Sequence, residues 1–195
     1  MKKITITLYS FNELPSEVQE KVIEDNRNIN LDHNWYDFIY DNWKEKLTAF
    51  GFINPEIYFS GFYSQGDGAC FDADIDLETI LKNAPEEYKK LILANNYIEF
   101  IISSYGMSNI YSHEQTKKID FSITKDHKLI KINTGFSTIL EKFLNWLESK
   151  RIEFCQQIYK DLQESYEYLT SDEAVKNTII ANEYTFEING SMRNE

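Results

Sequence analysis

EIYFSGFYSQGDGACFDADID, residues 56–76, is the stretch that decides the fold. An aromatic-rich arm precedes the segment SQGDG, and an arm in which aspartates alternate with other residues follows it. Glycines within this segment supply the positive φ angles that a tight turn requires. The pattern therefore predicts a β-hairpin at about 56–76. Two interpretations of it stay open: a catalytic or metal-binding loop, and a structural turn whose outer face is acidic.

Further segments on both sides of the hairpin have the pattern of β-strands. The first, ITITLY, alternates branched apolar residues with polar ones, and this period of two residues is typical of a strand. Strands are expected at residues 4–9, 97–104, 117–124 and 182–190.

Helical periodicity fills the intervals between these strands. The longest run predicts a helix at about 137–169, with an apolar stripe wide enough to lie over the core of a sheet. A helix of this length could also pair with a second copy of the chain, so a homodimer through it stays an alternative. Further helices are expected from Pro15, at about 35–50 with Gly51 at the end, at about 77–94 with a break near Pro85, and from Ser171.

Together these elements predict an α+β fold with a mostly antiparallel sheet and with the helices packed on one face of it. The 195 residues suit one domain, because domains commonly contain about 100–150 residues and a core still grows at this size. Seven glycines and three prolines leave little room for linkers. We therefore expect a single domain over residues 1–195.

The chain is strongly acidic, with 32 Asp and Glu against 20 Lys and Arg and a formal net charge of −12. This charge repels phosphate backbones, so direct binding of nucleic acid is disfavoured, whereas a partner with a basic surface would be attracted. Acidity alone also serves solubility. No stretch approaches the roughly 20 apolar residues of a membrane helix, and no apolar signal core is found at the start. A cytoplasmic protein without membrane contact is expected.

Asp72, Asp74 and Asp76 should share one face of the second hairpin arm, because side chains alternate along a strand. Steps of roughly 6.5–7 Å between them are awkward for one bridging cation. Leu77 and Asn83 stand where a calcium loop needs Gly and Glu, so neither a metal nor another cofactor is expected. The stripe is either a solvated face or a surface for a basic partner. The residues predicted to bind a partner are Tyr63, Gln65, Asp67, Asp72, Asp74 and Asp76.

The opposite arm leaves a second alternative open. Tyr58, Ser60 and Phe62 should lie on one face, next to the aspartates. If a helix covers this face they belong to the core, and if none does they form a mixed apolar and acidic surface of the kind that binds proteins.

The SQGDG turn and His113 form the alternative site. Backbone N–H groups around Ser64, Gly66 and Gly68 could hold an anion, and histidine is a common acid–base catalyst. The turn lacks the Lys and the strand–loop–helix context of a phosphate loop, and no spacing of known motifs identifies a catalytic residue. A small-ligand-binding protein or hydrolase would require the turn and His113 to meet in one cleft.

Several segments carry a family resemblance: LYSFNELPSEVQEKVIED (8–25), the IYFSGFYSQGDGACF hairpin (57–71), the YSH triplet (111–113) and YEYLTSDEAVKNTIIANEYTFEING (166–190). Together they resemble an uncharacterised family of proteins from bacteriophages and prophages, over about residues 8–190. The resemblance implies an accessory factor that acts on the host. Charge, size and resemblance together favour a protein without enzymatic activity that binds a bacterial host protein and inhibits it by steric and electrostatic block. One class of such factors inhibits bacterial immunity (anti-CRISPR and other anti-defence proteins).

Overall fold

Helices and antiparallel strands divide the chain into two units in the computed structural model, which describes residues 5–94, 98–104, 112–123 and 134–193. Unit 1 combines residues 1–36 with 163–195, and unit 2 contains residues 37–162. Both contain helices together with antiparallel strands, so the predicted α+β class is confirmed. The single domain expected from chain length stays a prediction.

The predicted hairpin lies at the centre of unit 2. β2 (Phe52–Ser60) and β3 (Gly68–Ile75) pair antiparallel along their whole length, interrupted by one bulge. At the bulge Asn54 adopts a φ of 51°, which Asn tolerates better than most residues, and Pro55 follows it. A bulge is one of the few places in a sheet that accept proline, because proline has no N–H to donate to the strand ladder.

Two further strands complete a four-stranded sheet in the order β2-β3-β4-β5. β4 (Ile98–Ser104) pairs with β3 at Asp74↔Ile101, and β5 (Lys117–Ile123) pairs with β4 along its length. Both strands were expected from the sequence within one residue of these bounds.

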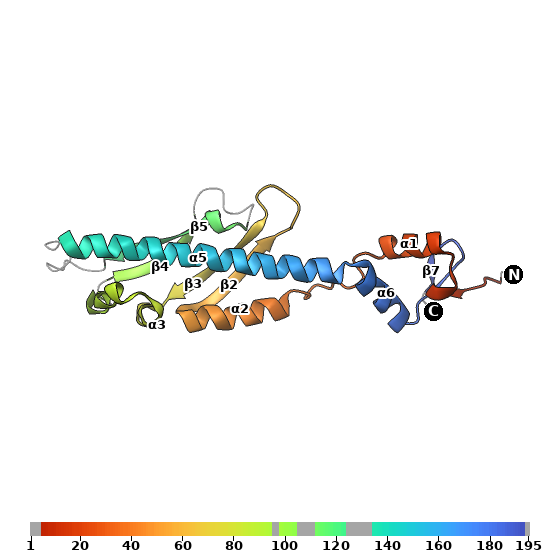
Figure 1. The fold of residues 1–195 in the computed structure, drawn as a ribbon, viewed down its shortest axis with the longest axis horizontal. Coiled ribbons are helices and arrows are strands. Elements are labelled where there is room, and N and C mark those ends of the chain that lie inside the picture. Colours follow the sequence, from red (N-terminus) through yellow and green to blue (C-terminus); the bar gives the residue numbers. More distant parts are fainter. Residues whose placement is uncertain (1–4, 95–97, 105–111, 124–133, 194–195) are drawn as a thin grey trace, which may run out of the picture. The chain divides into compact units, whose positions relative to one another are not determined.

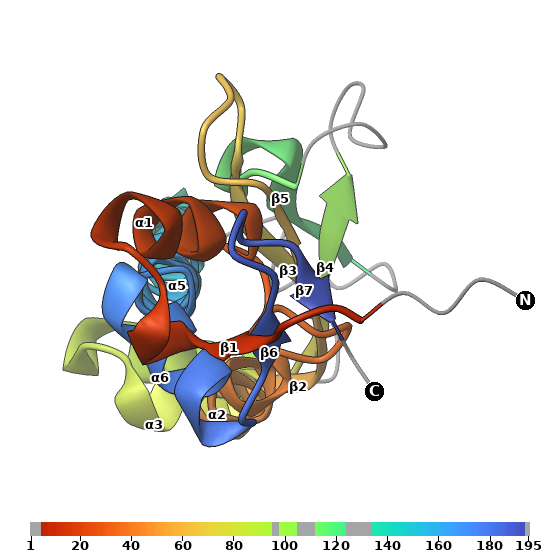
Figure 2. The ribbon, with the colours of Figure 1, turned by 90° about the vertical axis from the view of Figure 1, so that its right-hand side faces the viewer.

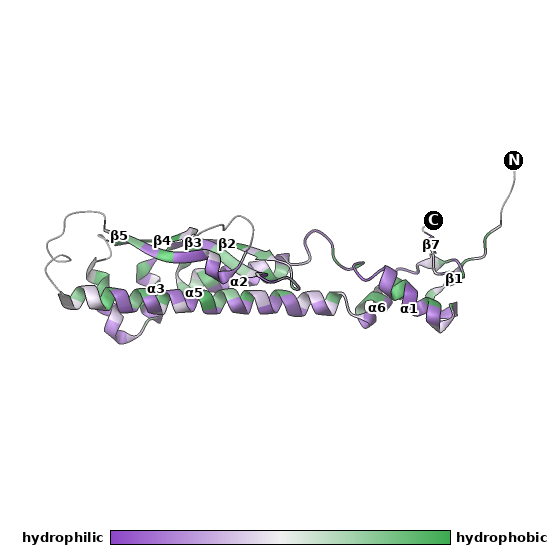
Figure 3. Cartoon of the chain, turned by 90° about the horizontal axis from the view of Figure 1, so that it is seen from above, coloured by the Kyte–Doolittle hydropathy of each residue, from purple (hydrophilic) through white to green (hydrophobic). Residues whose placement is uncertain are grey.

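The helices of unit 2 cover one face of this sheet, as predicted. Figure 3 shows the four strands in one layer with α5 (Thr134–Leu169) along one side of it, and α2 (Asp37–Phe50) lies on the same side. The expected break after residue 83 separates α3 (Leu77–Asn83) from a 3₁₀-helix, η2 (Glu86–Ala94) (Figure 1).

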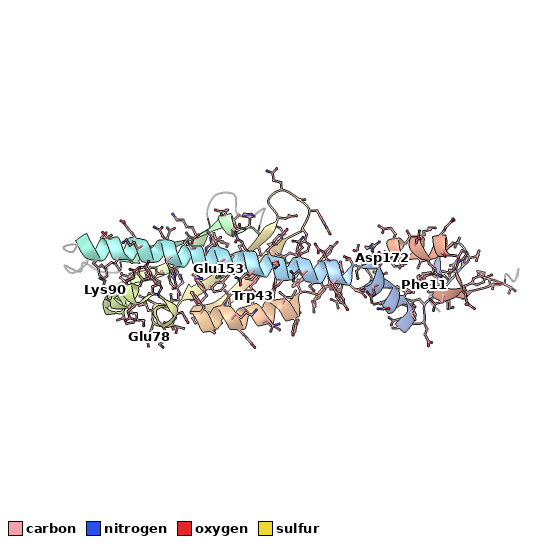
Figure 4. All side chains as sticks on the ribbon, viewed as in Figure 1. Phe11, Trp43, Glu78, Lys90, Glu153 and Asp172 are labelled. Atoms are coloured by element: carbon pink, nitrogen blue, oxygen red, sulfur yellow. The ribbon has the colours of Figure 1, made fainter. Side chains whose placement is uncertain are left out.

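Aromatic side chains fill the space between the sheet and these helices. The rings of Phe52 and Phe71, one from each arm of the hairpin, have centroids 5.0 Å apart and are fully buried. Trp43 of α2 lies toward α5 (Figure 4), where its ring is 6.2 Å from that of Phe154 and its Nε1 donates to Asp161 Oδ2 at 2.8 Å. The wide apolar stripe of the long helix is therefore core within unit 2.

Unit 1 is built from short elements (Figure 2). Its sheet has the order β1-β6-β7, formed by β1 (Tyr9–Ser10), β6 (Thr185–Phe186) and β7 (Met192–Arg193). A 3₁₀-helix, η1 (Phe11–Glu13), and the helices α1 (Ser16–Asp25) and α6 (Asp172–Ala181) accompany it. The buried core consists of Phe11, Leu14, Val22, Val175, Ile179 and Phe186.

Two strand predictions are wrong in extent. Strand pairing begins only at Tyr9, so residues 5–8 of the predicted strand belong to no strand. At the other end the strand expected over 182–190 is reduced to β6, because Asn182 still caps α6 and a turn closes from Glu187 to Gly190. Local backbone hydrogen bonds at helix ends and turns compete with strand pairing there.

Candidate functional site

The sheet of unit 2 has a second face, turned away from the helices. Glu56 lies opposite Asp72 in the β2–β3 ladder, and Asp74 lies opposite Ile101 in the β3–β4 pairing. We call this surface the outer sheet face, and it comprises Glu56, Tyr58, Asp72, Asp74, Glu99 and Ile101. A groove of about 710 Å³ is lined by these residues except Tyr58, together with neighbours from the same strands and Leu77.

The outer sheet face is acidic. Four carboxylates, those of Glu56, Asp72, Asp74 and Glu99, line the groove, and its described lining contains no Lys or Arg. One cation lies beside them: Lys117 Nζ is 2.7 Å from Asp72 Oδ2. The described lining of the groove therefore carries four carboxylates, of which one is paired with a cation.

Two partly exposed apolar side chains accompany the carboxylates. Ile101 is 46% exposed and Tyr58 is 39% exposed, so no helix of the described chain covers them. The Tyr58 hydroxyl donates to Glu56 Oε2 at 2.6 Å, and this hydrogen bond, with partial burial, raises the pKa of Tyr58 to about 12. Lys117 Nζ lies 5.6 Å from the centre of the Tyr58 ring, within cation–π range. The alternative of an exposed mixed surface therefore holds for Tyr58.

Phe62, expected on the same face as Tyr58, lies elsewhere. Its ring stacks on Phe59 at 5.7 Å and contacts Tyr159 of α5 at 5.5 Å, so it belongs to the side of the helices. β2 ends at Ser60, and Gly61 with a φ of 46° redirects the chain before the period of the strand can continue.

Asp76 is separated from the predicted acidic stripe because β3 ends at Ile75. Its carboxylate caps α3, accepting from the Glu78 N–H at 3.1 Å and from Thr79 Oγ1 at 2.5 Å. These bonds satisfy donors that the first turn of a helix leaves unpaired. Of the three aspartates, therefore, only Asp72 and Asp74 lie on the outer sheet face.

The loop of residues 61–67 binds the carboxylate of its own residue Asp67 through backbone N–H groups. Asp67 Oδ2 accepts from the backbone N–H groups of Tyr63 at 2.9 Å and Ser64 at 2.7 Å. This carboxylate takes the place expected for an external anion, and a Cβ on Gly61 would lie 2.8 Å from it. Asp67 thus shapes the loop. Gln65 is exposed and the Tyr63 side chain is 79% exposed, at the loop end of the hairpin.

The two glycines of the SQGDG segment have different roles. Gly66 adopts a φ of 97°, as predicted for the turn. Gly68 is required for close packing, because an added Cβ would lie 2.8 Å from His113 Cδ2 and 3.1 Å from its Cα. The structure therefore brings His113 against one end of the predicted turn.

His113 has a polar neighbour at each ring nitrogen. Nδ1 accepts from the Gln115 N–H at 3.1 Å, and Nε2 lies 3.2 Å from Glu114 Oε2. A neutral ring that carries its proton on Nε2 satisfies both contacts. Neither His113 nor the 61–67 loop lines the groove described above. The contacts of His113 with Gly68 and Gln115 are structural.

Arg151, which no sequence pattern indicated, holds the segment that carries His113 and Lys117 against α5. Its side chain is completely buried, and Nη2 donates to the carbonyl oxygens of Glu114 and Lys117, each at 2.7 Å, and to Glu148 Oε1 at 2.6 Å. Burial alone would lower the pKa of Arg151, but the hydrogen bonds to Glu148, together with the electrostatic influence of Cys155, Glu148 and Cys70, raise the pKa on balance.

Glu99 and Ile101 were also missed as surface residues. The segment YIEFIISS is apolar at both alternating positions around Glu99, which favours the interpretation of a strand buried on both faces. Ile101 is exposed and therefore does not fit a strand that is buried on both faces. The single charge in this run, Glu99, was the available signal that one face is open.

Over the described ranges of the chain, no cluster of three or more His, Cys, Asp or Glu is arranged to hold a metal ion. In the same ranges no helix combines the length and apolar character needed to cross a membrane.

The fold and its outer sheet face define an α+β protein with an acidic sheet surface that no helix of the described residues covers. Residues 35–172 match the family described as Domain of unknown function (DUF8835). Because this match covers well over half of the 195 residues, the chain belongs to that family. The matched range includes all of unit 2 and hence the outer sheet face. No curated protein and no solved structure matches the chain.

Proposed function

We propose that this chain is a binding protein of bacteriophage type that attaches to a basic surface of a bacterial host protein in the cytoplasm and blocks it. The observation that carries the proposal is the outer sheet face, which no helix of the described chain covers and on which four carboxylates line the same groove as Ile101. An inhibitor of bacterial immunity whose target holds nucleic acid in a basic channel is the host-directed role that fits this charge best.

Charge and apolar contact have separate roles in this proposal. The carboxylates attract a basic partner over a distance and exclude acidic ones, which affects the association rate and specificity most. Ile101 and Tyr58 supply the apolar contact area that a lasting complex needs at its centre. Lys117, bound to Asp72, keeps one carboxylate paired in the free protein.

The experiment that tests the proposal is a capture of host proteins from bacterial lysate with the tagged chain, at low and moderate salt. The test variant is Asp74→Lys with Glu99→Lys, which reverses two charges in the groove. The matched control is Glu20→Lys with Glu45→Lys, because these exposed helical residues change the net charge equally elsewhere.

We expect one dominant partner that weakens as salt rises, is lost with the groove variant and is kept with the control. Purified partner and chain should then bind with the same dependence on the variants. Equal loss with both variants would show that net charge alone attracts the partner, and no partner at either salt would overturn the proposal.

A further inference from the structure

Residues 5–8 are a strand-like segment to which the fold gives no strand partner. TITLY has the alternation and the β-branched composition of a strand, yet pairing starts only at Tyr9. All four residues are exposed, and among them are two large apolar side chains, Ile6 at 51% and Leu8 at 36%. The segment runs outward from unit 1 ahead of β1 (Figure 2).

β1, which this segment precedes, is an edge strand. Its pairing is with β6, through Tyr9↔Phe186 and Ser10↔Thr185, and it ends the order β1-β6-β7. Natural edge strands are commonly protected by Lys, by other charged residues, by Pro or by a bulge. Residues 5–10 contain no charged residue and no Pro, so this edge is unprotected.

We propose that residues 5–9 pair antiparallel with the same residues of a second copy of the chain, about a two-fold axis at Thr7. In this register Ile6 lies opposite Leu8 of the partner subunit, and Leu8 lies opposite Ile6 of the partner subunit. Thr7 meets its own counterpart. The two three-stranded sheets of unit 1 become one continuous sheet across the dimer.

The sequence of the segment is self-complementary in this register. Tyr9 packs against the core of unit 1, so the period of two residues places Thr5 and Thr7 on the core side. Ile6 and Leu8 then share the other side, where each finds an apolar cross-strand neighbour in the second copy. Branched apolar pairs and Thr–Thr pairs are among the favourable cross-strand combinations.

A second copy is favoured over a different partner because a two-fold axis uses the same surface twice. The chain carries a net charge of −12, so two copies repel each other at most surfaces. Residues 5–10 offer an uncharged line along which two copies can approach. The proposed dimer uses none of the residues of the outer sheet face and does not depend on the proposed function.

The first test measures the mass of the full chain in solution as a function of protein concentration. We expect a reversible dimer for the natural chain, and Ile6→Lys should raise the dissociation constant by about tenfold or more, since it places a charge in the line of contact. Ile188→Lys is the matched control, because Ile188 is a similarly exposed apolar residue of unit 1, and it should leave the dimer unchanged.

The second test fixes the register. Thr7→Cys should form a disulfide-linked dimer under mild oxidation, because directly opposed Cβ atoms of paired strands are roughly 4.5–5.5 Å apart. Ile6→Cys should not, since its own counterpart is displaced by two residues. The natural Cys70 and Cys155 are buried in unit 2 and do not compete. A monomer at every concentration, or a dimer that Ile6→Lys leaves intact, would overturn the proposal.

Discussion

Arg151 shows how one residue can organise a surface that it does not touch. It is buried below the segment 114–117 and fixes two of its carbonyl groups, while Glu148 pairs with it and also accepts from the Ile119 N–H at 3.0 Å. The position of Lys117 beside Asp72 on the outer sheet face depends on this arrangement.

Replacing Arg151 by Met should lower the free energy of unfolding by about 3–5 kcal/mol, because the partly buried Glu148 loses its cation and the carbonyl groups of Glu114 and Lys117 lose their buried donor. The double variant Arg151→Met with Glu148→Met should lose less than the sum of the two single losses, since neither charge remains unpaired. Urea unfolding of the four proteins measures both quantities. Strictly additive losses would contradict a coupled pair.

The buried thiols predict a pH dependence. Burial raises the pKa of Cys155 to about 12 and also raises the pKa of Cys70, whereas an unfolded thiol ionises at about 8.5. Both thiols stay neutral in the folded protein while the unfolded chain loses protons. Their stabilising contribution is therefore complete below about pH 8.5 and is lost progressively as the pH rises toward the folded pKa.

Urea unfolding at about pH 7 and about pH 9.5 should show this loss before most tyrosines ionise. Cys155→Ala, compared with itself at the two pH values, should lose less stability than the natural chain. An equal loss in the variant would assign the effect to other groups.

At the scale of single elements, the boundary of β3 separates a residue of the outer sheet face from a helix cap. Asp74 lies inside the strand on the outer sheet face, and Asp76 lies just beyond it as the cap of α3. Asp76→Ala should lower the free energy of unfolding by about 1 kcal/mol and leave partner binding unchanged. Asp74→Ala should weaken binding and change stability by less than about 0.5 kcal/mol.

Denaturation and binding measurements on the same two variants separate these effects. Asp76→Asn keeps a side-chain acceptor at the cap and should retain most of the stability, which serves as the control. A binding loss with Asp76→Ala that matches the loss with Asp74→Ala would return Asp76 to the binding surface.

Elements with a strong local period were predicted closely, whereas weakly paired strands were not. The hairpin, the end of α2 at Gly51, the break after α3 and the cap of α6 at Ser171 all follow from side-chain patterns and turn chemistry. The extent of a strand depends on which backbone lies beside it. For this reason residues 5–8, 182–184 and 187–190 were wrongly included in strands.

At the scale of the whole molecule, the net charge of −12 predicts opposite effects of salt on the two proposed associations. Raising salt from about 0.1 M to about 1 M shortens the screening length from about 10 Å to about 3 Å. Binding of a basic partner should weaken, because attraction is screened. The dimer through residues 5–9 should strengthen, because repulsion between two acidic copies is screened. Dissociation constants of both complexes at the two salt levels measure this, and a dimer that weakens with salt would indicate a charged interface.

The sequence by itself determined the α+β class, most of the elements, the acidic character and the alternation that places Asp72 and Asp74 on one face of a strand. These properties depend on local period and composition. Only the tertiary structure decided that this face is uncovered, that Glu56, Glu99 and Ile101 join it, and that Asp67, Asp76 and His113 are occupied by structural contacts. Those outcomes depend on tertiary contacts between segments that are far apart in the sequence. The spacing of residues along the chain does not specify these contacts.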